Sequence, residues 1–229
     1  MCGRYSNTGS KADDLQRRIA NRLGVAQPAS ERGFERFNIA PTQEVLAAVE
    51  DERGRRMEEL RWGLVPSWAK GPKPAPPMIN ARAETVRERP AYRDLVAQAR
   101  HRCLLLADGW YEWQKPEDPR LPRRPVHFSL EGGEPFCFAG LWSAATSSCT
   151  ILTCEANDVA RPIHDRMPIV LTDPARWDAW LDPRLDGSAV SELLVPLPAG
   201  ELAARPANPV VNSVANEGPR CLEAELTLL

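Results

Sequence analysis

Hydrophobic residues along the chain gather in short apolar runs in the middle and adopt helical spacing nearer the ends. The runs between residues 102 and 171 are RCLLLADG, WYEW, VHFSL, FCFAGLW, TILTCEA and MPIVL. Each has the length of a strand, and most are bounded by Gly, Pro or charged residues, which is typical of β-structure. Upstream, EVLAAVE and MEELRWG predict two further strands joined by a turn around DERG. The pattern therefore predicts a central β-sheet.

Helical spacing marks the segments that flank these strands. Residues 10–24 place Leu or Ile at every fourth position, between a serine that can cap a helix and a glycine that can end it. PAYRDLVAQAR predicts a second helix, because proline is tolerated near a helix start. Two short helices are expected over PARWDAWL and SAVSELL, followed by a proline-rich tail.

Two proline-rich stretches, AKGPKPAPP and QKPEDPRLPRRP, predict loops, and no stretch clearly separates two cores. Strands dominate the middle and helices the flanks, which favours an α+β fold. We therefore expect a single domain over residues 1–229. Its centre is expected to be a mostly antiparallel, barrel-like β-sheet flanked by helices.

Composition narrows the class of protein. The chain has 229 residues, of which 43% are hydrophobic, enough for a sizeable core. A formal net charge of -2 excludes a uniformly basic nucleic-acid coat. The chain has no run of 18 apolar residues and no basic-then-apolar leader, so we expect no membrane span and a location inside the cell.

The six cysteines do not suggest a disulfide framework in a chain of this length. Cys137 and Cys154 lie in apolar, strand-like runs, so we expect them to be small core residues. The three histidines are scattered along the chain, and we expect neither a metal site nor a cofactor.

The chain begins MCGRY, which places a cysteine directly after the initiator methionine. Residue 2 is small, so we expect Met1 to be removed, which leaves Cys2 with a free α-amine beside its thiol. One interpretation is a cysteine in a disordered tail. The other is a trap for aldehydes: the amine forms a Schiff base, and the thiol then closes a five-membered thiazolidine. Reference pKa values of about 8 for the amine and about 8.5 for the thiol make both reactive forms accessible near neutral pH.

Such chemistry moves protons, and three polar residues are candidates to assist it. Glu112 in ADGWYEW alternates onto the same strand face as Trp110, where desolvation would raise the pKa of its carboxyl group. His164 in RPIHDRMP could carry protons, and Asn80 in MINARAET could hold an oxygen. The alternatives are a solvent-facing glutamate, a structural histidine and a turn or cap asparagine.

The motifs MCGRY, RFNIAPT, RWGLVPSWA, INARAET, LADGWYEW and IHDRMPIVL occur in this order. Together they resemble the SRAP (SOS response-associated peptidase) family of abasic-site-processing proteins, from Cys2 to about Pro219. The resemblance implies a sensor of abasic sites in single-stranded DNA, which crosslinks Cys2 to the exposed sugar aldehyde as a thiazolidine. It also implies that Glu112 assists imine chemistry, that His164 promotes sugar ring opening and crosslink reversal, and that Asn80 positions the sugar and the Cys2 backbone.

The resemblance further implies DNA contacts around this site. Phosphate-binding candidates are Arg4, Arg82, Arg89 and Arg166, and candidates for stacking or wedging against bases are Pro41, Trp68, Trp110 and Trp113. Aromatic stacking tolerates any base, which suits a damage sensor. We expect a monomer that acts in the cytoplasm of a bacterium, associated with the nucleoid.

Two other functions remain open from the sequence. Cys2 and His164 could instead form the nucleophile and base of a cysteine peptidase. The arginines and Trp68 could alternatively form a non-covalent single-strand binding module. A lyase activity is also conceivable, because an imine at the sugar carbon invites β-elimination.

Overall fold

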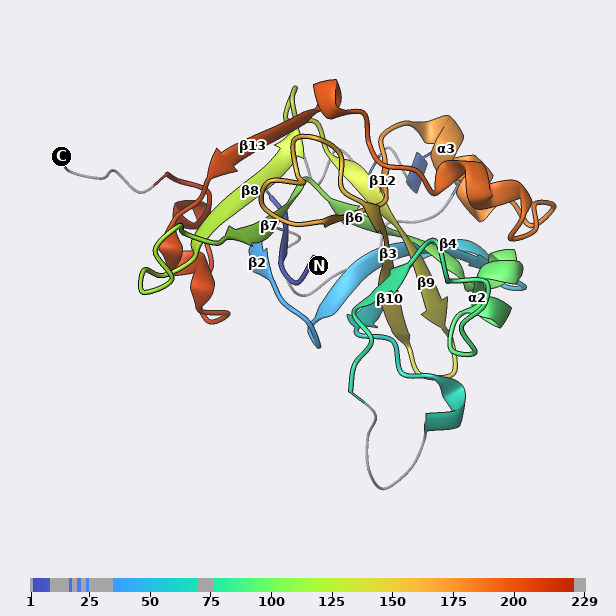
Figure 1. The fold of residues 1–229 in the computed structure, drawn as a ribbon. Helices are drawn as coiled ribbons and strands as arrows, with labels where there is room; N and C mark the ends of the chain where they lie inside the picture. The colour runs from blue at the N-terminus through green and yellow to red at the C-terminus, as the bar shows by residue number, and fades with distance from the viewer. Residues whose placement is uncertain are drawn as a thin grey trace.

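The computed structural model describes residues 2–8, 17, 20, 21, 24, 35–69 and 76–224. Its strands form two sheets with short helices around them (Figure 1). The first sheet has the order β13-β8-β7-β1-β2, and every neighbouring pair is antiparallel. Its strands are β1 (Tyr5–Asn7), β2 (Arg36–Ile39), β7 (Gly109–Gln114), β8 (Arg124–Leu130) and β13 (Leu202–Pro206).

The second sheet has the order β11-β10-β4-β3-β6-β9-β12, and β5 pairs with β10 outside this path. Because β9 also pairs with β10, the path β10-β4-β3-β6-β9 closes on itself like a barrel. Only the pairings of β10 with β4 and with β5 are parallel among the described strands. The strands of this sheet are β3 (Glu44–Asp51), β4 (Gly54–Trp62), β5 (Asn80–Arg82), β6 (Arg102–Ala107), β9 (Phe136–Ser143), β10 (Ser148–Glu155), β11 (Arg166–Pro168) and β12 (Val170–Leu171).

The helices are short and lie at the edges of the sheets (Figure 1). Helix α2 comprises Arg93–Ala97, and helix α3 comprises Pro174–Leu181. The 3-10 helices are η1 (Ser67–Ala69), η2 (Ala99–His101), η3 (Ala189–Leu193), η4 (Ala199–Glu201), η5 (Pro209–Asn212) and η6 (Pro219–Cys221). In the described part of the chain, no helix has the length and apolar character to cross a membrane.

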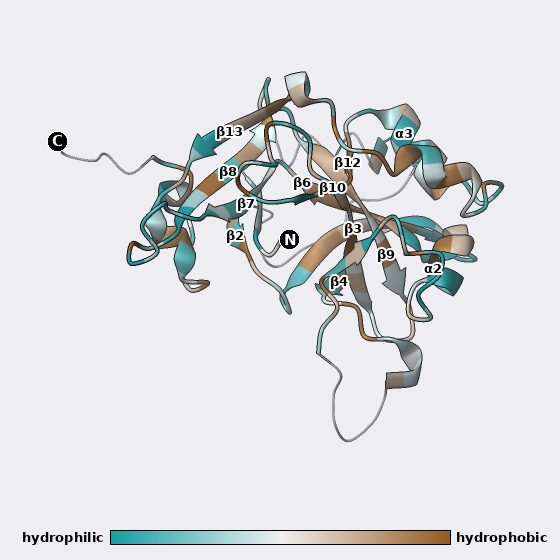
Figure 2. Ribbon diagram, viewed as in Figure 1, coloured by the Kyte–Doolittle hydropathy of each residue, from teal (hydrophilic) through white to brown (hydrophobic). Residues whose placement is uncertain are grey.

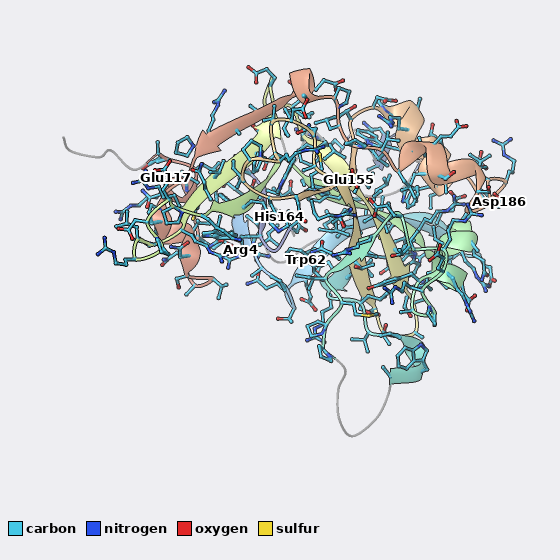
Figure 3. The ribbon with its side chains drawn as sticks, viewed as in Figure 1. Arg4, Trp62, Glu117, Glu155, His164 and Asp186 are labelled. Carbon is cyan, nitrogen blue, oxygen red and sulfur yellow. The ribbon has the colours of Figure 1, made fainter. Side chains whose placement is uncertain are left out.

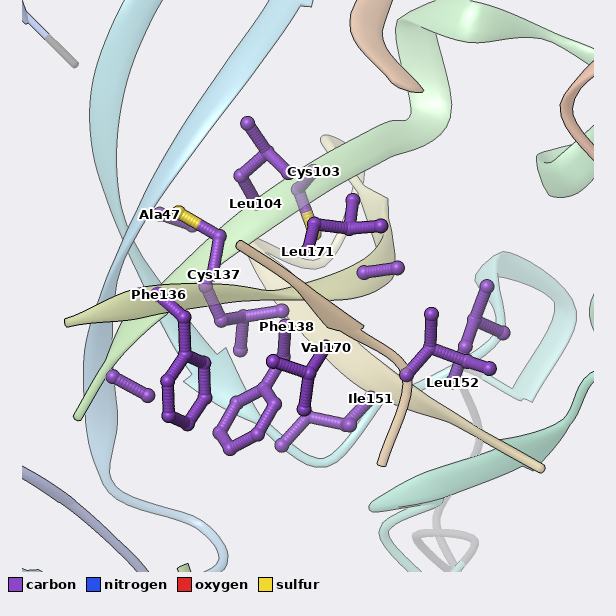
Figure 4. Packing of buried hydrophobic residues seen from close by; sticks show 14 of the residues in the cluster. Ala47, Cys103, Leu104, Phe136, Cys137, Phe138, Ile151, Leu152, Val170 and Leu171 are labelled. Atoms are coloured by element: carbon purple, nitrogen blue, oxygen red, sulfur yellow. The ribbon is translucent and has the colours of Figure 1, made fainter. Parts of the chain in front are cut away.

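The main core fills the space between the sheets and beneath α3. Figure 2 shows the apolar strands gathered in the interior, and Figure 4 shows Phe136 and Phe138 packed beside Ile151. Helix α3 begins where Asp173 accepts a hydrogen bond from the Arg176 amide at 3.0 Å. A second, smaller core contains Phe37, Tyr111, Ala207, Val211 and Cys221.

The α+β, barrel-like, mostly antiparallel fold predicted from the sequence is confirmed. Strands occupy all of the predicted runs, MPIVL being divided between β11 and β12. Cys137 and Cys154 are buried in the main core, as predicted. The loop predicted over QKPEDPRLPRRP is confirmed for residues 115–123, whereas its last two residues begin β8.

Several predictions differ from the structure. The helix expected over PAYRDLVAQAR is reduced to α2 and η2, and SAVSELL forms the 3-10 helix η3. The short strands β1, β2, β5 and β13 were not predicted, because their hydrogen-bonding partners are distant in sequence. Of the helix predicted over residues 10–24, only residues 17, 20, 21 and 24 are described, the first three of them helical. Residues 70–75 of the loop AKGPKPAPP lie outside the described residues.

Candidate active site

Cys2 lies just before β1, close to the N-terminus marked in Figure 1. Its side chain is fully buried in the main core. The Asn80 side-chain amide donates a hydrogen bond of 2.8 Å to the Cys2 carbonyl oxygen. The two residues are 78 positions apart, so this contact joins distant parts of the chain.

Asn80 opens strand β5, not the turn that was the alternative interpretation. β5 is held on β10 in parallel register, with Asn80 opposite Ile151. The indole of Trp62 donates to the neighbouring Ile79 carbonyl at 3.0 Å, and the Tyr92 hydroxyl donates to the Asn80 carbonyl at 3.3 Å. The buried Asn80 Oδ1 atom has no hydrogen-bond partner among the described residues. Asn80 can therefore hold Cys2 and still accept a hydrogen bond from a ligand.

Glu112 lies on β7 opposite Val126 and is 5% exposed. Strand alternation places Trp110 in the main core, whereas Tyr111 and Trp113 pack in the second core, as the sequence pattern predicted. Burial raises the pKa of Glu112 to about 7, although the positive amino terminus acts in the opposite direction. At neutral pH this carboxyl group can both accept and release a proton.

His164 ends a turn that follows β10. The Asn157 side chain accepts hydrogen bonds from the Val159 and Ala160 amides at 3.1 and 3.0 Å, and the His164 amide donates to the Ala160 carbonyl at 3.0 Å. These bonds fix the turn that presents the imidazole.

The His164 Nδ1 atom accepts a hydrogen bond from the Arg166 amide at 3.0 Å and lies 2.9 Å from the Asp165 carboxylate. A backbone amide is a fixed donor, so the neutral ring carries its proton on Nε2. The contact with the well-exposed Asp165 becomes an ion pair only on protonation of Nδ1. Burial and, next, the positive amino terminus lower the pKa of His164. The imidazole is therefore neutral at pH 7 and able to accept a proton.

Electrostatic effects on their pKa values show that Cys2, Glu112 and the His164 turn lie near one another. The Glu112 carboxylate affects the pKa of the Cys2 thiol, and the Asp165 carboxylate, next to His164 in the chain, affects the pKa of Glu112. Burial, followed by Glu112, raises the pKa of the Cys2 thiol well above its usual range. The thiol is consequently protonated at neutral pH. The structure thus places the Cys2 thiol near the Glu112 carboxyl group, and Glu112 near the turn that carries His164.

Arg4 and Arg166 are both buried and engaged within the protein. Arg4 Nη1 donates to Asn38 Oδ1 at 2.7 Å and to the Val211 carbonyl at 2.6 Å. Arg166 forms a two-bond ion pair with Glu84, at 2.7 and 2.8 Å, and donates to the Thr153 carbonyl at 2.7 Å. In this arrangement both guanidinium groups hold elements together.

Arg82 and Arg89 are exposed. Arg82 lines a surface pocket beside the His164 turn, together with Glu155, Arg161, Asp165 and Arg166. Figure 3 shows His164 and Arg4 near the middle of the molecule, far from Glu117 and Asp186 at its two ends. Among the candidate phosphate ligands, Arg82 is exposed to solvent and also lies next to the His164 turn.

The aromatic candidates differ in accessibility. Trp68 on η1 is 71% exposed, and Pro41 and Trp113 are partly exposed. The Trp113 indole donates to Asn212 Oδ1 at 2.6 Å. Trp110 is fully buried and stacks on Phe128, with ring centroids 5.1 Å apart. The predicted DNA contact by Trp110 is therefore corrected: its ring lies inside the core on the same strand face as Glu112.

No role was predicted for Asn38 from the sequence, although this residue lies in the motif RFNIAPT. Asn38 is fully buried and contacts both Arg4 and the C-terminal segment. Its place between Phe37 and Ile39 could have indicated a buried amide, and a buried amide needs hydrogen-bond partners.

Comparisons with known proteins show the family to which the chain belongs. The family model described as SOS response associated peptidase (SRAP) matches residues 1–214. The chain belongs to the SRAP family. The abasic site processing protein YoqW of Bacillus subtilis is 36% identical to it over 233 residues, covering 98% of this chain and all of the relative. YedK of Escherichia coli, which carries the same descriptive name, is 28% identical over 231 residues, covering 97% of this chain and 99% of the relative.

A solved structure of a protein from Bacteroides thetaiotaomicron shares the fold. The TM-score is 0.75 at 19% sequence identity, with 98% of this chain and 100% of that chain covered.

Proposed function

We propose that the protein recognises abasic sites in single-stranded DNA and captures them covalently through Cys2. The central observation is that Cys2 shares one site with Asn80 and Glu112, and that Glu112 in turn is coupled to Asp165 beside His164. The names of the full-length relatives YoqW and YedK point to the same substrate. A protein of this function works in the bacterial cytoplasm on nucleoid DNA, and we propose that it acts as a monomer.

The covalent step requires removal of Met1, so that Cys2 carries the free amine. The amine nitrogen attacks the aldehyde carbon of the ring-opened sugar to give a carbinolamine. Loss of water from the carbinolamine gives an imine. The thiol sulfur then bonds to the imine carbon, and its proton goes to the nitrogen. The products are a thiazolidine and one water molecule, so no oxidant or metal is needed.

The order of these steps follows from the burial of Cys2. The amine reacts first, because burial keeps the thiol protonated. Glu112, with a pKa of about 7, removes a proton from the attacking amine and returns one to the leaving hydroxyl group. Neutral His164 accepts the sugar hydroxyl proton during ring opening. Asn80 holds the Cys2 carbonyl through its amide, and its unpartnered Oδ1 accepts a hydrogen bond from the sugar.

Exposed side chains provide a surface for DNA. Arg82 and Arg89 contact backbone phosphates, which sets position without reading sequence. Trp68, Pro41 and Trp113 contact bases that flank the lesion; stacking on an aromatic ring contributes about 1–3 kcal/mol per base. Arg4 and Arg166 support this surface from inside through their buried contacts.

Intact-mass measurement tests the proposal directly. Purified protein is expected to lack Met1, and mixing it with a single-stranded abasic oligonucleotide should add the mass of the DNA minus one water. The undamaged oligonucleotide serves as the control and should add nothing. Retention of Met1 on the purified protein, or the absence of an adduct, would contradict the covalent mechanism.

The second candidate function is that of a cysteine peptidase, because the description of the matching family contains the word peptidase. Cys2 would be the nucleophile and His164 the base. Peptidases use a thiolate of lowered pKa, whereas burial raises the pKa of this thiol. Cys2→Ser separates the two functions: it abolishes the thiazolidine and leaves at most a reducible imine, whereas a peptidase could retain some activity through the hydroxyl. Strand cleavage on the abasic DNA, measured in the same reactions, reports any lyase activity.

A further inference from the structure

The nucleophile proposed above lies at the very start of the chain, where residues of most proteins are poorly ordered unless held in place. Strand β1 follows Cys2 and is only 3 residues long. Precise capture of an aldehyde requires the amine to be held close to its target. Two groups of side chains hold residues 4–8 in place.

One group holds Arg4. Asn38 Oδ1 accepts from Arg4 Nη1 at 2.7 Å, while Asn38 Nδ2 donates to the Ser213 and Asn216 carbonyls at 2.9 and 2.8 Å. The Val211 carbonyl accepts a second bond from Arg4 Nη1. Asn38 thereby links the start of β1 to the C-terminal segment, residues 208–217. We call this group the Asn38 clamp.

A second group holds the other end of β1. Asp108 Oδ1 accepts from the Ser6 hydroxyl at 2.6 Å, and Asp108 Oδ2 accepts from the Thr8 amide at 2.8 Å and from the Thr8 hydroxyl. The Ser6 oxygen also lies 3.0 Å from His127 Nε2. Burial lowers the pKa of His127 to about 4, so the ring is neutral. Because the Ser6 hydroxyl gives its proton to Asp108, the Ser6 oxygen accepts a hydrogen bond from His127 Nε2–H. We call this group the Asp108 clamp.

Both clamps are enclosed by the protein. Asn38 and Ser6 are fully buried, and Asp108 is 8% exposed. Neither Asn38 nor Asp108 contacts Cys2 in the described structure; each acts on the backbone or side chains of residues 4–8. Buried polar networks of this kind impose one arrangement on the chain, because any shift leaves a polar group without a partner.

We infer that Asn38 and Asp108 are positioning residues for the Cys2 aminothiol, clamping β1 at both ends so that the amine meets the aldehyde at a fixed place. This inference rests on the proposed function. It predicts that loosening either clamp slows covalent capture by more than it weakens DNA binding. The Asp108 clamp separates the two effects best, because none of the proposed DNA-contacting side chains belongs to it.

The test compares Asn38→Ala and Thr8→Val with Thr8→Ser and Ser148→Ala. Thr8→Val keeps the side-chain shape but removes the hydroxyl that donates to Asp108, whereas Thr8→Ser keeps the hydroxyl. Ser148 is a fully buried serine of another hydroxyl network, in the second sheet, and serves as the matched control. Each protein is mixed with saturating abasic oligonucleotide, and the single-turnover crosslinking rate is measured well below its melting temperature. Non-covalent affinity is measured in a Cys2→Ser background.

We expect Asn38→Ala to reduce the crosslinking rate by about tenfold or more, and Thr8→Val to reduce it by several fold. Thr8→Ser and Ser148→Ala should retain the wild-type rate, and the affinity of the Thr8 and Ser148 variants for DNA should stay within about twofold of wild type. For Asn38→Ala, the saturating oligonucleotide keeps the single-turnover rate independent of a modest loss of affinity. Wild-type rates for both Asn38→Ala and Thr8→Val would overturn the inference, as would a loss of affinity that accounts for the slower rate. Failure of the wild-type protein to crosslink would instead overturn the proposed function. If Asn38→Ala does not fold, Thr8→Val decides the outcome.

Discussion

At the scale of single residues, Glu112 combines a buried position on strand β7 with an unusual pKa. Its carboxyl group lies beside the fully buried Trp110 on the same strand face, and burial raises its pKa to about 7. The folded state therefore binds a proton that the unfolded state releases between pH 4.5 and pH 7. Since the unfolded state binds fewer protons in this window, ionisation of Glu112 destabilises the fold as the pH rises.

Replacing Glu112 by Gln removes this titration. We expect Glu112→Gln to gain stability relative to wild type as the pH rises from 4.5 to 8, by up to roughly 3 kcal/mol, because one pKa unit corresponds to about 1.4 kcal/mol. Urea denaturation at a series of pH values measures the difference. Glu117→Gln, at an exposed position, should show no such trend. A difference between Glu112→Gln and wild type that does not vary with pH would mean that Glu112 titrates normally.

At the scale of elements, strand β7 carries Glu112 on one face, and on the other face Gly109 packs closely against His127 of β8. Gly109 opens this strand, and the His127 ring of β8 occupies the space where a side chain would stand. A Cβ atom at Gly109 would lie 2.1 Å from His127 Nε2 and 2.6 Å from the Phe128 carbonyl oxygen. The close approach of the two strands at this point therefore requires glycine.

Gly109→Ala is expected to destabilise the protein by about 1–3 kcal/mol or more, because a backbone carbonyl must move as well as a side chain. Thermal or urea unfolding gives the value. Gly200→Ala is the matched control, since nothing lies within 4 Å of a Cβ atom there. Equal stability of the two variants would show that β7 and β8 can separate at this position without cost.

At the scale of the whole molecule, a net charge of -2 coexists with exposed arginines near the site. Many acidic residues are engaged in ion pairs elsewhere, such as Asp182 with Arg184 at 2.7 Å, next to helix α3. Local positive charge, not the overall sum, determines attraction to a phosphate backbone.

Arg82→Ala and Arg89→Ala are each expected to weaken binding to single-stranded DNA and to reduce the slope of log Kd against log salt by about one. Binding is measured by fluorescence anisotropy in a Cys2→Ser background to prevent crosslinking. Arg184→Ala, near α3, should leave the slope unchanged. A slope that stays constant in the Arg82 and Arg89 variants would remove these arginines from the DNA-binding surface.

Much of this architecture could be predicted from local sequence. Apolar runs of strand length gave β3, β4 and β6–β10, because side chains alternate between the two faces of a strand. The same alternation placed Glu112 with Trp110, and α3 coincides with PARWDAWL because Asp173 and Pro174 mark its start. The motifs also singled out Cys2 and Asn80, which the structure joins by a hydrogen bond.

The sequence alone determined the central sheet, the cysteine that follows Met1 and the polar groups around which the chemistry is proposed, since each depends on local residue order. Only the tertiary structure decided which of those residues are accessible. It buried Trp110 and engaged Arg4 and Arg166 inside the protein, and it paired the short strands β1, β2, β5 and β13 with distant partners. The physical reason is that burial and long-range hydrogen bonding depend on where other segments pack, which no local pattern encodes.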